Sequence, residues 1–154
     1  MTKLIVIEHA GENFTRVIST QIARFGGGVS VTHILPAAEF DEGEANIIVV
    51  SPSYHFAESE PKLRGGILLT PSGVPRFAEA RCVVTYGMSP KDTLTLSSIG
   101  EDACVLALQR ELITADGGIL ERQEFKIPAC GSTDESLACS GAMLLLGLQP
   151  SDYA

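Results

Sequence analysis

The sequence predicts an α/β fold: a three-layer, mostly parallel sheet of the P-loop or Rossmann-like type, with an antiparallel hairpin extension near the C-terminus. Three observations lead to this prediction. Apolar, β-branched runs alternate with an amphipathic segment and with polar, turn-rich stretches in the first half. The run "NIIVV" is continuously apolar, which is typical of a strand buried on both faces. After Asp92 the pattern changes to short strand-like segments around a turn.

The first half predicts a strand, a helix and then further strands. The apolar run "KLIV" precedes "FTRVISTQIARF", where Val17, Ile18, Ile22 and Phe25 recur at helical spacing, and the triplet "GGG" ends that helix. Strands are expected in "VSVTHIL", "NIIVV", "ILLT" and "CVVTYGM". A short helix beginning near Pro75 is expected in "PSGVPRFAEAR".

The second half predicts an antiparallel extension and a final helix. The segments "TLTLSSI", "CVLALQREL" and "ERQEFKI" are strand-like, and Asp116-Gly117-Gly118 predicts a turn among them. The last segment, "STDESLACSGAMLLLGLQP", has a capping box in which Ser132 and Glu135 cap the helix reciprocally. Gly147 and Pro150 end it.

Composition limits the classes of partner. The 154 residues suit one domain over 1–154, and 11 Lys and Arg against 19 Asp and Glu give a net charge of -8 without a basic cluster. Nucleic acid and anionic membrane are therefore not expected as partners. No segment approaches the ~20 apolar residues of a membrane span, so we expect a cytoplasmic protein. The four cysteines are Cys82, Cys104, Cys130 and Cys139. They form no Cys-x-x-Cys pair, which predicts free thiols and no metal site.

The final helix has more apolar surface than one sheet contact covers. Apolar residues occupy most of its circumference, whereas a helix lying on a sheet needs a stripe of little more than about 100°. Either the hairpin region or a second chain must cover the rest. The sequence favours a second chain, in a homodimer or with a protein partner, because an exposed leucine patch is an aggregation hazard.

Two segments resemble the central ATP-binding domain of the Mur ligases. In that family a strand ends at Asn/Cys-x-Asp-Asp-Pro, a helix follows, and the next strand ends in Thr-Tyr-Gly. "ILLTPSGVPRFAEARCVVTYGMSPKDT" is similar, most clearly at Val84-Thr85-Tyr86-Gly87. "IPACGSTDESLACSGAMLLLG" resembles the domain's last helix, which the family begins with Pro-Gly-x-His-Asn-x-x-Asn. The resemblance covers nearly the whole chain, as a trimmed relative of bacterial cell-wall ligases, and implies a P-loop at "IEHAGENFT".

The residues at the family's nucleotide-binding positions do not suit a nucleotide. A P-loop needs glycines whose amides converge on phosphate, a lysine, and a hydroxyl that binds magnesium. On this alignment His9 and Glu12 replace the glycines, Asn13 the lysine and Phe14 the hydroxyl, with Thr15 next. The acidic pair and the adenine-side residues are also replaced, by Ser72, Gly73, Gly131, Ser132 and Glu135. We therefore expect no ATP binding, no cofactor and no metal.

The leading hypothesis is a non-catalytic binding or scaffolding protein derived from a Mur-ligase-like ATPase domain. The sequence leaves open whether the chain is an enzyme, although the lost lysine and acidic residues disfavour catalysis. The alternative is a small-molecule-binding α/β domain, or an enzyme, that uses the crevice at the C-terminal ends of the strands. Glu8 and His9 there could be a catalytic pair, but a solvated loop capping the first helix is favoured. The ligand-binding candidates are His9, Gly11, Glu12, Asn13, Ser51, His55 and Thr70.

Overall fold

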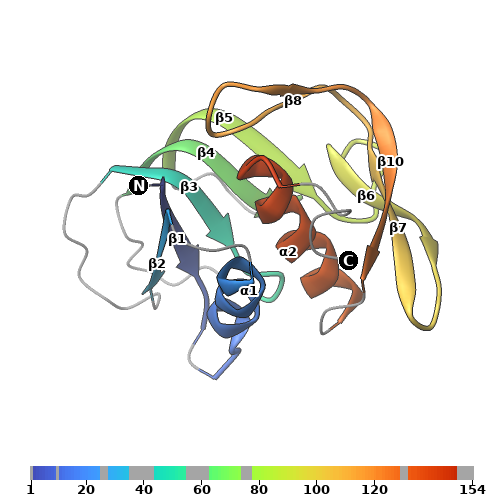
Figure 1. Cartoon of the computed structure of the whole chain (residues 1–154), viewed down its shortest axis with the longest axis horizontal. Coiled ribbons are helices and arrows are strands. Elements are labelled where there is room, and N and C mark those ends of the chain that lie inside the picture. The colour runs from blue at the N-terminus through green and yellow to red at the C-terminus, as the bar shows by residue number, and fades with distance from the viewer. Residues whose placement is uncertain are drawn as a thin grey trace.

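The computed structural model describes residues 2–9, 11–24, 28–34, 44–54, 63–73, 78–128 and 132–148. Its helices are α1 (Phe14–Ala23) and α2 (Thr133–Leu145). Its strands are β1 (Thr2–Ile7), β2 (Val29–Ile34), β3 (Glu44–Val50), β4 (Leu63–Pro71), β5 (Ala78–Tyr86), β6 (Leu94–Ile99), β7 (Ala103–Leu108), β8 (Leu112–Ile113), β9 (Ile119–Leu120) and β10 (Gln123–Pro128). Eight strands form one sheet in the order β10-β7-β6-β5-β4-β3-β1-β2, and β8 pairs with β9 alone (Figure 1).

The large sheet has a parallel part and an antiparallel part. Strands β2, β1, β3, β4 and β5 are parallel to their neighbours, and β5 joins β6 through the single pair Tyr86–Leu94. Strand β7 is antiparallel to both β6 and β10. The predicted α/β class is therefore confirmed, as are the mostly parallel sheet and the antiparallel hairpin near the C-terminus.

The central strands are buried because both of their faces carry apolar side chains. Ile47 to Val50 in β3 are all 0% exposed, as the continuous apolar run predicts. One face of the sheet shares a large core cluster with both helices. The other face carries a second cluster, in which Ile5, Ile48 and Leu68 pack together with Tyr54.

Both helices lie on the same face of the sheet (Figure 1). Helix α1 buries Phe14, Ile18 and Ile22 against it, close to the helical spacing that the sequence predicts. The two described helices thus form one layer. The Rossmann-like arrangement of three layers is not seen in the described part of the chain.

The short helix expected near Pro75 is wrong over residues 78–81. These residues are the start of β5, which pairs with β4 from Leu63–Ala78 to Pro71–Tyr86. A few residues of helix propensity are worth only tenths of a kcal/mol each, so the hydrogen-bonded ladder with a neighbouring strand outweighs them. Strand β4 also begins earlier than the expected run "ILLT", because residues from Leu63 onward pair with β3 and β5.

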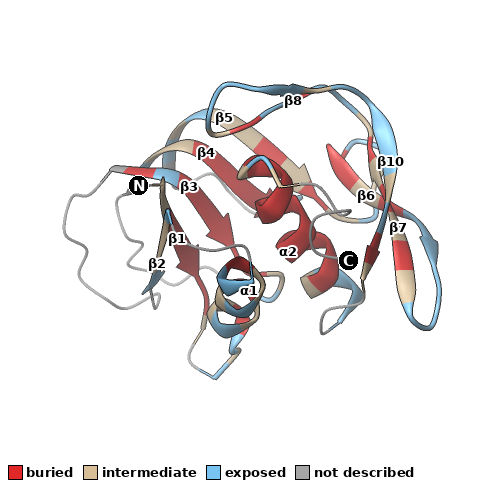
Figure 2. Cartoon of the chain, viewed as in Figure 1, coloured by how far each residue is buried: buried red, intermediate tan, exposed pale blue. Residues whose placement is uncertain are grey.

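Helix α2 begins as predicted and is buried all round within this chain. The Glu135 amide donates to Ser132 Oγ at 3.2 Å, and the Ser132 amide donates to the Glu135 carboxylate at 3.4 Å. Every residue from Ser136 to Leu145 is buried (Figure 2).

The hairpin region covers part of the apolar surface of α2 that the sequence was expected to bury against a second chain. The segment that contains β8 and β9 runs past the C-terminal end of α2 (Figure 1), where the Ala115 amide donates to the Leu145 carbonyl at 2.7 Å. Leu112, Leu106 and Ile127 belong to the same core cluster as the helix. The apolar surface of α2 therefore gives no reason to expect a homodimer.

Candidate functional site

The loop after β1 places a carboxylate at the N-terminus of α1. Glu8 is 2% exposed and accepts hydrogen bonds from the Thr15 amide at 3.0 Å and the Thr15 hydroxyl at 2.8 Å. Asn13, at the N-cap position of α1, makes no side-chain capping bond. Glu8 therefore caps the helix, although it lies outside the N-cap position and seven residues before Thr15 in the sequence. The capping role favoured for this loop is confirmed, but the capping carboxylate is buried rather than solvated.

His33 on β2 also contacts this carboxylate. Its Nδ1 lies 2.8 Å from Glu8 Oε1 and 3.3 Å from Thr15 Oγ1. The imidazole is 44% exposed, while the Glu8 side chain is 3% exposed. Since Nδ1 faces the carboxylate, Nε2 is the ring nitrogen that remains for other contacts. The sequence analysis did not single out His33, because β2 brings it to Glu8 only through strand pairing.

The predicted residues His9 and Glu12 hold the same loop in place. The His9 amide donates to Glu12 Oε1 at 3.0 Å, and the Glu12 amide donates to the His9 carbonyl at 3.2 Å. The His9 ring stacks on Tyr54, with centroids 5.2 Å apart. Gly11 and Asn13 have φ of 87° and 61°, in the left-handed region. These contacts shape the loop around the protein's own carboxylates.

Ser51 and Thr70 lie at the same carboxyl edge of the sheet. Ser51 is 0% exposed, and its hydroxyl makes no hydrogen bond with a described residue. The Thr70 hydroxyl donates to the neighbouring Pro71 carbonyl at 3.4 Å. His55 lies outside the described residues. The structure thus brings His9, Glu12 and Asn13 together in one loop, with Ser51 joined to it through the Ser51 amide and the Ile7 carbonyl, 2.9 Å apart.

Tyr86, at the end of β5, links this edge of the sheet to the end of β3. Its hydroxyl donates to the Val50 carbonyl at 2.5 Å. Burial raises the pKa of Tyr86 well above its ordinary value, and the negative charges of Asp134 and Glu12 raise it further. The negative charges of Glu12 and Asp134 therefore both contribute to the electrostatic potential at the Tyr86 ring. Together with Glu8 they make the carboxyl edge an unfavourable place for an anion.

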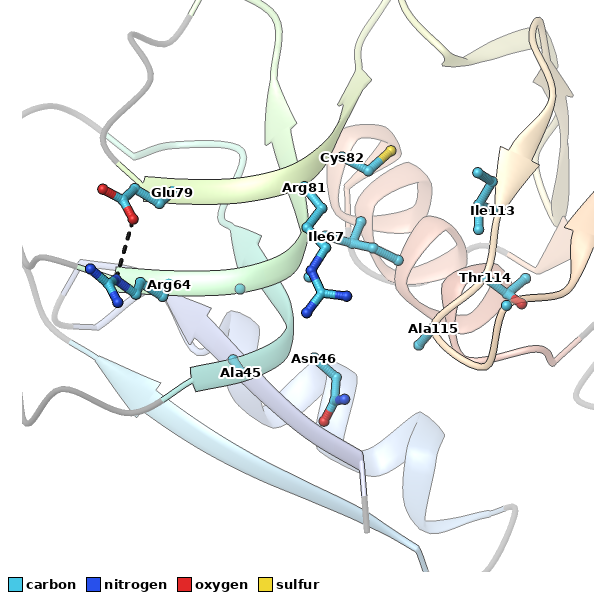
Figure 3. Close-up of a pocket in the computed structure, with 13 residues that line it drawn as sticks. Ala45, Asn46, Arg64, Ile67, Glu79, Arg81, Cys82, Ile113, Thr114 and Ala115 are labelled. Carbon is cyan, nitrogen blue, oxygen red and sulfur yellow. Dashed lines mark ion pairs between the residues drawn. The ribbon is translucent and has the colours of Figure 1, made fainter.

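The opposite end of the same strands carries a groove that the sequence analysis missed. It has a volume of about 730 Å³ and lies between the first residues of β3, β4 and β5 and the hairpin segment 113–117 (Figure 3). Its lining residues are Ala45, Asn46, Arg64, Gly65, Gly66, Ile67, Glu79, Arg81, Cys82, Ile113, Thr114, Ala115 and Gly117. Ligand sites in proteins commonly have volumes of this order.

The sheet is interrupted at one level beneath this groove. Residues on both sides of that level are paired across β3, β4 and β5, whereas Asn46, Gly66 and Arg81 are not. Ala45 and Ile48 face the same core cluster although they are three residues apart, an odd spacing that a regular strand does not allow. The three strands thus share an irregularity of the bulge type, which re-aims side chains.

The hairpin wall of the groove is built around a tight turn. The Thr114 hydroxyl donates to Asp116 Oδ1, and the Gly118 amide donates to the same oxygen at 3.2 Å. These two hydrogen bonds hold the pKa of Asp116 below its ordinary value. Gly117 has a φ of 89°, which confirms the predicted turn at Asp116-Gly117-Gly118. The turn fixes the wall by bonds within it.

A signal for this groove was present in the sequence. Gly65-Gly66 lie inside a strand, where glycine often marks a bulge or a close backbone approach. The polar residues that precede the pair are typical of a turn instead, which hides this signal. Which side chains surround it depends on the pairing of β3, β4 and β5, and no local pattern encodes that pairing.

Other kinds of site are not evident in the described part of the chain. No three His, Cys, Asp or Glu side chains there are grouped so as to hold a metal ion. Neither described helix is long and apolar enough to cross a membrane. Neither the scan against protein-family models nor the search of curated proteins found a match for this chain.

Proposed function

We propose that this chain is a non-catalytic binding protein, derived from a Mur-ligase-like ATPase domain whose nucleotide site is closed by its own carboxylate. The observation that carries the proposal is Glu8, whose carboxylate accepts the Thr15 amide and hydroxyl at the N-terminus of α1. A P-loop presents amides and a hydroxyl of this helix terminus to phosphate and magnesium, and Thr15 follows the aligned hydroxyl position by one residue. Here they are already bonded.

Electrostatics favour the same conclusion. ATP would bring several negative charges to an edge that holds Glu8, Glu12 and Asp134. Asn13 occupies the aligned lysine position and supplies no compensating charge. Two like charges about 4 Å apart repel by about 1 kcal/mol even in water, and by more near a protein surface. Glu8 would also have to leave a buried position before phosphate could enter.

The proposal includes a cytoplasmic protein with a role in bacterial cell-wall precursor metabolism. Cys82 and Cys104 are free thiols, which suits a reducing compartment. The link to cell-wall metabolism follows from the resemblance to the Mur ligases alone. A binding role needs a surface for a ligand or partner, and the groove at the amino ends of β3, β4 and β5 provides one.

The alternative is an acid–base enzyme that uses the pair of Glu8 and His33. The 2.8 Å contact between them is of the kind that orients a catalytic imidazole. A nucleophilic hydroxyl would have to donate to the imidazole, however, and Thr15 donates to Glu8 instead. This direction of the bond suits a helix cap better than a nucleophile with its base.

Calorimetry with Mg-ATP tests the proposal. We expect no measurable heat of binding for the wild-type protein. Glu8→Gln keeps the shape of the cap without its charge, and we expect no binding there either, because the lysine is still missing. A Kd below about 100 μM for the wild type, which corresponds to about 5.5 kcal/mol, would show that the site accepts nucleotide and would overturn the proposal.

A further inference from the structure

The charges that line the groove do not cancel. Arg64 Nε lies 3.2 Å from Glu79 Oε2, so those two residues form an ion pair at the rim. Arg81 also lines the groove, and no described carboxylate lies within ion-pair distance of it. Among the described residues, the lining therefore carries one positive charge without an ion-pair partner, in a chain whose net charge is -8.

Asn46, which also lines the groove, adds hydrogen-bond donors. Its Oδ1 accepts the Lys3 amide at 2.8 Å, which fixes the oxygen end of the side chain. The Nδ2 group is left to donate to whatever enters the groove. In Figure 3 the Arg81 side chain extends from β5 over β4, in the direction of Asn46 on β3. Arg81 and Asn46 both offer donors, so the complementary ligand group is an acceptor with negative charge.

The interruption of the sheet is what places these donors in the groove. Asn46 and Arg81 are exposed and stand at the level where the ladder is broken, with Gly66 between them on β4. A Cβ at residue 66 would lie 3.0 Å from the Asn46 carbonyl oxygen. Glycine therefore keeps the floor of the groove low where the Arg81 side chain extends over it.

The other side of the groove is apolar. Ile113 on the hairpin is 51% exposed and lines the groove. Ile67, Cys82 and Ala115 continue this surface toward the core. A ligand that placed an anionic group on Arg81 could bury an apolar group here.

We propose that the groove binds a small organic carboxylate with an apolar substituent. The carboxylate of the ligand accepts two hydrogen bonds from the Arg81 guanidinium and one from Asn46 Nδ2. The apolar substituent packs against Ile113. A monoanion suits the site better than a phosphate group, because among the described lining residues one cation, Arg81, lacks an ion-pair partner. The proposal rests on the proposed function in one respect, namely that the chain is a binding protein.

A titration with 4-phenylbutyrate, followed by amide chemical shifts in ¹H–¹⁵N spectra, tests this proposal. We expect saturable shifts that map to Asn46, Gly66 and Ala115. The uncharged 4-phenylbutanamide and the small anion acetate should each bind at least about tenfold more weakly, because each lacks one half of the interaction. A tetrapeptide with an apolar last residue, free or amidated at its C-terminus, separates a chain end from a free small molecule as the source of the carboxylate.

Variants assign the binding to the groove. Arg81→Gln should weaken 4-phenylbutyrate at least about tenfold, and Arg81→Lys should bind at an intermediate level, because the charge remains while the planar fork is lost. Arg64→Gln is the matched control, with an expected change below about threefold, since that arginine is paired at the rim. The dispersion of the spectra reports whether each variant is folded.

Three results would overturn the inference. The first is the absence of saturable shifts up to about 20 mM 4-phenylbutyrate, because a Kd above that concentration is too weak for a functional site. The second is equal binding of the amide and the carboxylate. The third is unchanged binding by a folded Arg81→Gln variant. The calorimetry with Mg-ATP addresses the other edge of the sheet, so its outcome and this one are independent. An ATP-binding protein could still pass this test, and a protein without ATP binding could still fail it.

Discussion

At the scale of single residues, Glu8 decides the character of the carboxyl edge. One buried carboxylate satisfies the Thr15 amide and hydroxyl at the start of α1 and also contacts His33. The positive end of the helix dipole favours a negative group at this position. In a P-loop protein the bound phosphate is that group. In this chain a side chain serves the same electrostatic purpose permanently, so the helix is stabilised without a ligand.

Replacement of Glu8 should cost stability. Glu8→Ala leaves the Thr15 amide and hydroxyl without their partner, and we expect the free energy of unfolding to fall by about 2–3 kcal/mol. Urea denaturation measures this change. Glu12→Ala is the matched control in the same loop, with an expected loss of about 1 kcal/mol, because Glu12 accepts only the His9 amide among the described contacts. Equal effects of the two variants would show that Glu8 has no special capping role.

Tyr86 predicts how stability depends on alkaline pH. Burial raises the pKa of Tyr86 in the folded state, whereas in the unfolded chain the phenol ionises at about pH 10. Below about pH 10 both states are protonated, and the contribution of Tyr86 is constant. Above it only the unfolded state loses the proton, so stability falls as pH rises.

Comparison with Tyr86→Phe isolates this effect. At neutral pH the variant should be less stable by about 1–2 kcal/mol, since the Val50 carbonyl loses its donor. Because phenylalanine does not ionise, the gap between wild type and variant should narrow above about pH 10. Urea unfolding between pH 7 and pH 11 measures both parts. A gap that stays constant over this range would mean that Tyr86 ionises equally in the folded and unfolded chain.

At the scale of elements, α2 and the hairpin that carries β8 and β9 depend on each other. The helix is apolar around most of its circumference, and a flat sheet could cover only one side of it. Here the Ala115 amide bonds to the Leu145 carbonyl and holds the hairpin segment over the end of the helix. The hairpin is therefore part of the core as well as one wall of the groove.

A charge at Leu145 distinguishes this intramolecular cover from cover by a second chain. Leu145 is 0% exposed, so Leu145→Glu buries an unpaired carboxylate and should lower the free energy of unfolding by more than about 4 kcal/mol. Far-UV circular dichroism and urea denaturation should show an unfolded or barely stable protein. Ile119→Glu, at a residue that is 62% exposed, should stay folded. A folded, monomeric Leu145→Glu protein from a dimeric wild type would instead favour the second chain.

At the scale of the whole molecule, the two ends of the parallel strands have opposite electrostatic character. The carboxyl edge holds Glu8 and Glu12, with the charge of Asp134 also acting there. The groove at the amino ends is lined by Arg81, which pairs with no carboxylate among the described residues. Open α/β sheets commonly bind ligands at the carboxyl edge. If both proposals hold, this chain has closed that edge and binds at the other one.

Self-association remains a prediction, but it needs a different surface. Helix α2 is covered within the chain, and the large apolar side chains that are exposed in the described residues are Met88, Ile99, Ile113 and Ile119. Ile113 and Ile119 face each other as a cross-strand pair in the β8–β9 hairpin. A dimer formed there would compete with a ligand in the groove, because Ile113 belongs to both surfaces.

The sequence by itself determined the features that depend on neighbouring residues. The capping box at Ser132 and Glu135 and the turn at Asp116-Gly117-Gly118 follow from local backbone and side-chain chemistry. The prediction that the loop after β1 does not bind phosphate also rests on residue types, since the aligned glycine and lysine positions hold His9, Glu12 and Asn13.

Only the tertiary structure decided what depends on pairing between distant strands. His33 reaches Glu8 because β2 lies beside β1, and Ala78 to Arg81 are strand because β4 offers them a ladder. The cover of α2 and the groove at Arg81 arise in the same way, from segments that are far apart in the chain. Hydrophobic burial rewards any partner of the right shape, so a sequence pattern shows that an apolar face must be covered without showing by what.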